Sequence, residues 1–155
     1  MADAKQAEDR KDFPGAINSY SELVTAHQQS PQAEEAQYHI ALIYNNEMHD
    51  VVKAIEAYRT LYVKFPTSAH APSALFLTGF LYNNELHRVD SAKAIYESFV
   101  RLYPSNELAS SARFELNTLG QDADEVLHKD ILAKQPADSG GEIKTLPARI
   151  KAPKQ

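Results

Sequence analysis

A pattern of residues that recurs every 38 positions is the feature that most constrains how this chain folds. An internal period of about 20–50 residues is typical of solenoids, in which each unit buries its apolar face against the next unit. The pattern is A-x3-Y-x2-[LF], and it places its members at i, i+4 and i+7 on one face of a helix. The three copies are Ala16-Tyr20-Leu23, Ala54-Tyr58-Leu61 and Ala92-Tyr96-Phe99. We call each of these predicted helices helix B of its unit.

A second pattern with the same period lies between those segments and predicts a helix A for each unit. Its copies are Ala36-Tyr38-Ala41-Tyr44, Ala74-Phe76-Gly79-Tyr82 and Ala112-Phe114-Asn117. Gly79 falls in the middle of its predicted helix, where glycine costs about 1 kcal/mol relative to alanine. We therefore expect a neighbouring helix to approach Gly79 too closely for a larger side chain.

The connectors between the helices follow the same scheme. The asparagine pairs 45–46 and 83–84 are predicted to end helix A, because asparagine tolerates the left-handed conformation. Asp12 and Asp50 precede helix B, four residues before its first alanine, and Thr67-Ser68 and Ser105-Asn106 are expected to cap the next helix A. Pro66 and Pro104 end two of the B helices, since proline cannot continue a helix.

These patterns predict an all-α fold, a solenoid of antiparallel helix pairs closed by a C-terminal capping helix. The repeat domain is expected over 1–134, with a flexible, mildly basic tail over 135–155. The predicted units are about 1–30, 31–68, 69–106 and 107–120, followed by an amphipathic capping helix over 122–134. Residues 4–11 provide only a short polar helix A for the first unit, so we expect that the chain lacks part of a repeat at its N-terminus.

Composition excludes several classes of function. The 155-residue chain has a formal net charge of −5, which gives no electrostatic basis for binding nucleic acid or anionic lipid. Cysteine is absent, so disulfides and thiolate metal sites are excluded. No apolar run approaches the roughly 18 residues that cross a bilayer. The scattered histidines and the lack of any catalytic or phosphate-binding motif predict no metal site, no cofactor and no enzyme activity.

The repeated pattern resembles the tetratricopeptide repeat. The residues that carry the resemblance are Ala41-x2-Tyr44, Ala54-x3-Tyr58-x2-Leu61 and Pro66, with their counterparts 38 residues later. The standard unit has about 34 residues, and longer units with an aromatic-proline break are similar to a bacterial envelope subgroup. That subgroup includes Tol–Pal accessory proteins and outer-membrane assembly lipoproteins. The resemblance implies protein or peptide partners and, if an N-terminal signal has been removed, a place in the periplasm or at the outer-membrane periphery; the cytoplasm is the alternative.

The same resemblance implies a binding surface on the concave face of the array, which helix A would line. The predicted partner-binding residues are Tyr38, Leu42, Asn45, Phe76, Phe80, Asn83 and Phe114. Two interpretations of the aromatic residues in this set remain open. They form an exposed stripe that anchors a partner, or they pack against adjacent helices as most apolar stripes do. The basic residues that a chaperone-tail clamp needs are missing from these positions.

The repeat pattern and the resemblance lead to two hypotheses about function. The first is a non-catalytic scaffold that binds a protein or peptide segment in bacterial envelope assembly or maintenance. The alternative is a self-association module, a homo-oligomer that stacks through the open ends of its repeats.

Overall fold

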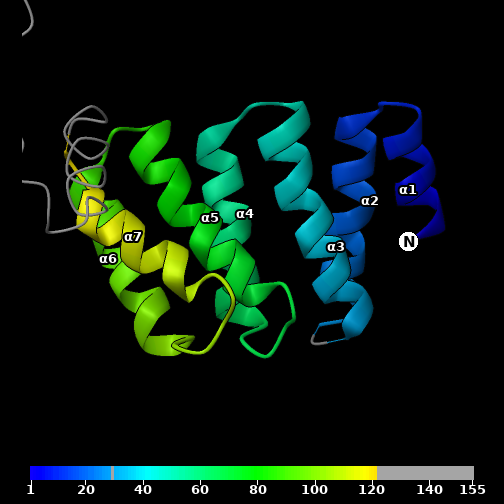
Figure 1. Cartoon of the computed structure of the whole chain (residues 1–155). Coiled ribbons are helices and arrows are strands. Elements are labelled where there is room, and N and C mark those ends of the chain that lie inside the picture. Colours follow the sequence, from blue (N-terminus) through cyan, green and yellow to red (C-terminus); the bar gives the residue numbers. More distant parts are fainter. Residues whose placement is uncertain (29, 122–155) are drawn as a thin grey trace, which may run out of the picture. The chain divides into compact units, whose positions relative to one another are not determined.

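The 38-residue period corresponds to a series of helices, each packed on the next (Figure 1). The structure, a computed structural model, describes residues 1–28 and 30–121. The predicted capping helix over 122–134 and the tail over 135–155 lie outside the described residues. The elements are α1 (Ala2–Asp9), α2 (Phe13–Ala26), α3 (Pro31–Leu42), the π-helical turn η1 (Ile43–Glu47), α4 (Val51–Lys64), α5 (Ala71–Asn84), α6 (Val89–Leu102) and α7 (Ala109–Thr118). All regular elements of the described residues are thus helical, which confirms the predicted fold class.

The predicted helix pairs are present in order. Helices α1, α3, α5 and α7 are the A helices, and α2, α4 and α6 are the B helices. Helix α1 is the short A helix expected for the first unit, and it buries Ala4 and Ala7. Within the described residues, no helix is long and apolar enough to span a bilayer.

Aspartate side chains cap the first two B helices, whereas the predicted capping residues of the A helices make no such cap: His70 and Leu108 stand at the N-caps of α5 and α7 without a side-chain cap. Asp12 accepts a hydrogen bond from the backbone N–H of Gly15 at 3.1 Å, and Asp50 accepts one from that of Lys53 at 3.1 Å. Such caps satisfy backbone donors that a helix leaves free at its N-terminus. The third B helix departs from the pattern, since Arg88 stands at its N-cap without a side-chain cap.

The prediction that asparagine pairs end helix A is confirmed for residues 83–84, since α5 ends at Asn84, and is wrong for residues 45–46, which are followed by further helical residues. Among the described residues other than glycine, the left-handed ones are Lys11, His49 and His87, with φ of 60°, 52° and 51°, and they recur every 38 residues. Residues 45–46 lie inside η1, where Met48 N–H donates to the carbonyl of Ile43. In both units the left-handed conformation is adopted only at the residue before the next N-cap.

The core is built around one tyrosine from each B helix. Tyr20, Tyr58 and Tyr96 are fully buried, as are the alanines one turn before them. Gly79 of α5 lies against the last of these rings. A Cβ at Gly79 would lie 2.8 Å from Cε1 of Tyr96, a distance that real Cβ contacts do not reach. The expected close approach at Gly79 is confirmed.

Candidate functional site

The structure divides the predicted aromatic row into two kinds of residue. Tyr38 is half-buried and stacks on His70, with ring centroids 4.0 Å apart. Phe76 is half-buried and meets the rings of Tyr96 and Phe99 at centroid distances of 5.4 and 5.9 Å. Aromatic pairs at such distances contribute to packing. For Tyr38 and Phe76, the described contacts thus agree with the packing interpretation.

The other two aromatic residues of the row are exposed. Phe80 of α5 retains 40% of its accessible surface and Phe114 of α7 retains 58%. Phe114 is the counterpart of Phe76 in the next unit, but equivalent sequence positions here have different surroundings. An exposed phenylalanine on each of two A helices is the clearest apolar feature among the predicted site residues.

The polar and aliphatic members of the predicted site are half-buried. Leu42, Asn45 and Asn83 all fall in this class. The side chain of Asn45 donates to Asn46 at 2.7 Å, so part of its hydrogen-bonding capacity is used within its own turn. These residues therefore offer less surface to a partner than Phe80 and Phe114.

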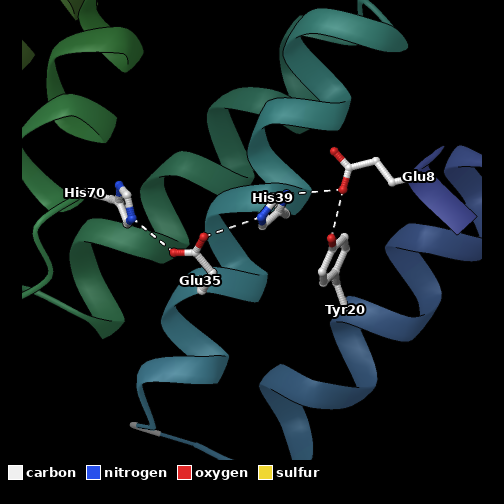
Figure 2. Close-up of polar contacts among 5 residues, drawn as sticks. All are labelled: Glu8, Tyr20, Glu35, His39 and His70. Carbon is white, nitrogen blue, oxygen red and sulfur yellow. Dashed lines mark hydrogen bonds and ion pairs between the residues drawn. The ribbon is translucent and has the colours of Figure 1, made fainter. Parts of the chain in front are cut away.

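A chain of polar contacts joins three units at the A helices, and sequence reasoning missed it (Figure 2). Tyr20 of α2 donates to Glu8 of α1 at 2.8 Å, and Glu8 lies 3.2 Å from Nδ1 of His39. Nε2 of His39 lies 3.5 Å from Glu35, one turn earlier on α3. Glu35 in turn contacts Nε2 of His70, which stands before α5, at 3.2 Å. We call Glu8, Tyr20, Glu35, His39 and His70 the polar chain.

The polar chain alternates acidic and imidazole groups, but it does not gather them at one point. Within the described part of the sequence, no three histidine, aspartate or glutamate side chains are placed to hold a metal ion. Figure 2 shows His39 and His70 on opposite sides of Glu35. The arrangement links helices through successive pairwise contacts and provides no coordination site.

The buried tyrosines differ in how their hydroxyl groups are satisfied. The hydroxyl of Tyr20 has Glu8 as its partner, whereas those of Tyr58 and Tyr96 have no hydrogen-bond partner among the described residues. A buried hydroxyl without a partner loses hydration and gains nothing in return.

Replacing these tyrosines with phenylalanine should therefore have unequal effects. We expect Tyr20→Phe to lower the free energy of unfolding by about 1.5 kcal/mol, because it leaves a carboxylate without its donor. Tyr58→Phe should change the stability by less than about 0.5 kcal/mol, since it removes a hydroxyl that has no partner. Urea unfolding of the two variants measures the difference, and equal losses would contradict the assignment of the hydroxyl contacts.

The buried tyrosines also predict a loss of stability in alkali. Burial raises the pKa of Tyr58 to about 12, and burial together with the contact to Glu8 raises the pKa of Tyr20. Above pH of about 10, the unfolded chain loses phenolic protons that the folded chain retains. Stability contributed by Tyr58 is therefore complete below that pH and is lost as the pH rises toward 12. Thermal unfolding at pH 9 and 11, with tyrosinate absorbance as the second readout, should show a midpoint that falls less in Tyr58→Phe than in the wild type.

The helix pairs stack one after another along the chain, and their A helices carry exposed side chains. This arrangement defines an α-solenoid repeat protein. Residues 35–68 and 73–106 match the family model of the tetratricopeptide repeat. The first match contains most of α3, then η1 and α4, and the second contains most of α5 and all of α6. These segments are tetratricopeptide repeats, which confirms the predicted repeat family. No curated protein matches the chain significantly.

Proposed function

We propose that this chain is a non-catalytic scaffold that binds a protein or peptide segment through the face presented by α5 and α7. Tetratricopeptide repeats generally mediate protein–protein interactions. The observation that carries the proposal is the exposure of Phe80 and Phe114 on two A helices. Exposed aromatic side chains mark interaction sites, because their burial by a partner removes a large apolar area from water.

The structure improves the choice of variants for testing this proposal. Phe76 was part of the predicted site, but its contacts with Tyr96 and Phe99 mean that its replacement would disturb the core. Phe80 and Phe114 are the more exposed members of the row, at 40% and 58%, so their replacement should disturb packing less than that of Phe76. Val63 of α4 and Leu102 of α6 provide a matched control, since they are 62% and 59% exposed on B helices.

The partner should first be trapped with a photo-crosslinking amino acid placed at 80 or 114 in the producing cell, and then identified by mass spectrometry. We expect Phe80→Ser/Phe114→Ser to weaken binding of that segment at least tenfold, in line with the loss of aromatic anchors of about 2 kcal/mol or more. Val63→Ser/Leu102→Ser should change the affinity less than twofold. Circular dichroism establishes that both variants are folded. Unchanged affinity of the first variant would contradict the proposed surface.

We further propose a role in bacterial envelope assembly or maintenance, in the periplasm or at the outer-membrane periphery. Support comes from the 38-residue unit and its aromatic-proline breaks at Phe65-Pro66 and Tyr103-Pro104. Cell fractionation of the gene product, detected by antibody, tests the location. Recovery with cytoplasmic markers would favour the alternative.

Self-association by stacking of open repeat ends is the competing function. The exposed side chains of α1 include Lys5, Gln6 and Asp9, so this helix offers little apolar surface to a second copy. Sedimentation velocity at several concentrations separates the two functions. Concentration-dependent dimers that persist in Phe80→Ser/Phe114→Ser would favour stacking.

A further inference from the structure

Glu115 of α7 is a half-buried acidic residue without a compensating contact. Burial raises the pKa of its carboxyl group, because a less hydrated environment disfavours the charged form. Within the part of the chain that the structure describes, its carboxylate has no hydrogen bond and no ion pair. These residues therefore leave the carboxylate partly dehydrated and unpaired.

A second unsatisfied polar group lies close to this carboxylate. Tyr96 of α6 is fully buried, its ring lies against Gly79 of α5, and its hydroxyl has no hydrogen-bond partner among the described residues. Burial and then the charge of Glu115 raise the pKa of Tyr96, which shows that the two groups are near each other. In the first unit the equivalent hydroxyl, that of Tyr20, donates to a carboxylate at 2.8 Å. The region between α5 and α7 thus retains hydrogen-bonding capacity that the first unit has used.

The repeat places Glu115 beside the two exposed phenylalanines. Its counterpart in α3 is His39, which extends toward the preceding A helix and lies 3.2 Å from Glu8 there (Figure 2). The same direction from α7 leads toward α5, which carries Phe80. Phe114 precedes Glu115 in the sequence, so the two lie within about 100° of each other on the surface of α7. A carboxylate therefore lies among the apolar side chains of the proposed binding face.

No basic side chain of α5 or α7 neutralises this carboxylate. Helix α5 has no charged residue, and the guanidinium of Arg113 on α7 donates instead to the carbonyl of Pro104 at 3.4 Å. The formal net charge of the chain, −5, adds a long-range attraction for cations. The face thus combines apolar area with one negative charge that is not paired.

We infer that the segment bound by α5 and α7 carries a cationic side chain, arginine or lysine, which pairs with Glu115 while its apolar neighbours cover Phe80 and Phe114. Charge-assisted hydrogen bonds are stronger than neutral ones, and the attraction increases when a bound segment excludes water. An acidic segment would meet repulsion at the same place. This partner chemistry rests on the proposed function of the α5–α7 face.

Selection of random peptides displayed on phage, with the immobilised full chain as the target, tests the inference. Peptides selected by the wild type should combine arginine or lysine with aromatic or aliphatic residues. Peptides selected by Glu115→Gln should keep the apolar residues and lose the enrichment in basic ones. Glu97→Gln, the same change at an exposed position of α6, should select the same peptides as the wild type. Basic residues enriched equally by the wild type and Glu115→Gln, or by neither, would overturn the inference.

A synthetic copy of the peptide most enriched on the wild type then measures the pairing. We expect Glu115→Gln to bind it about tenfold more weakly, with a smaller difference at high ionic strength. Replacing the basic residue of the peptide with glutamine should weaken binding to the wild type by a similar factor and leave binding to Glu115→Gln unchanged. Glu115→Lys should instead prefer a peptide that carries glutamate at that position. Independent effects of the two replacements would contradict the pairing.

Two further measurements keep the result interpretable. Glu115→Gln removes a partly dehydrated charge, so its thermal unfolding midpoint should not fall below that of the wild type. The Phe80→Ser/Phe114→Ser variant separates the cationic chemistry from the face itself. If only the chemistry is wrong, this variant loses the peptide and Glu115→Gln retains it. If the face is wrong, both variants retain the peptide.

Discussion

Replacing Gly79 with leucine should lower the free energy of unfolding by about 3 kcal/mol or more, because the new side chain has no space. A Cβ at this position would lie 2.8, 3.0 and 3.1 Å from Cε1, Cζ and Cδ1 of Tyr96. Tyr96 of α6 is fully buried and its ring contacts that of Phe76 on α5. The ring therefore cannot move without also disturbing the packing of α5. Urea unfolding measures the loss as a change in the midpoint at constant m-value.

Gly79→Ala is the finer test of the same contact. Alanine is better than glycine in a helix interior by about 1 kcal/mol, whereas overpacking of a core costs about 1–3 kcal/mol. We expect the second effect to dominate and the variant to lose about 1 kcal/mol. Ala41→Gly in the preceding unit serves as the comparison and should also lose about 1 kcal/mol, through helix propensity. A Gly79→Ala variant more stable than the wild type would show that Tyr96 does not restrict this position.

The 38-residue period was sufficient to predict the helices and the close approach at Gly79. Each of these depends on the local environment, and a repeat reproduces that environment at every copy. The position at which helix A ends was predicted correctly for α5, which ends at Asn84, but not for the preceding unit, where η1 extends to Glu47. It depends on the backbone hydrogen bonds of the last turn, which carry the chain to His49 and His87, and asparagine's intrinsic preference does not determine them.

The polar chain was missed because its residues are not repeated from one unit to the next. The counterparts of His39 in the following units are Leu77 and Glu115, and the counterpart of Glu8 is Asn46. Comparison of the repeats therefore treats these residues as variable positions. The available signal was the spacing of Glu35 and His39, which places them one helical turn apart. Contacts between units cannot be inferred from the period alone.

The predicted aromatic row shows how far equivalence between units extends. Phe76 and Phe114 hold the same position in α5 and α7, yet Phe76 contacts two rings of α6 and Phe114 is 58% exposed. The sequence predicts which side of the helix each ring occupies. Whether that ring is covered depends on the next helix, and the segment after α7 lies outside the described residues.

Phe99→Ala should have the largest effect of any single truncation in the column formed by Leu23, Leu61 and Phe99. Phe99 is fully buried and lies 5.9 and 5.5 Å from the ring centroids of Phe76 and Tyr103. Removing its ring should cost about 4 kcal/mol. Leu61→Ala should cost about 3 kcal/mol, and Leu23→Ala should cost less, because Leu23 is only half-buried.

The location of the loss is as informative as its size. In the described array each helix contacts mainly its neighbours along the chain, so stability is expected to be a sum of local terms. Phe99→Ala should therefore remove hydrogen-exchange protection from α5, α6 and α7 while α2 to α4 remain protected. Leu102→Ala, on the same helix but 59% exposed, is the control and should change stability by less than about 0.5 kcal/mol. Equal loss of protection along the whole array would instead mean that the repeats unfold as one cooperative unit.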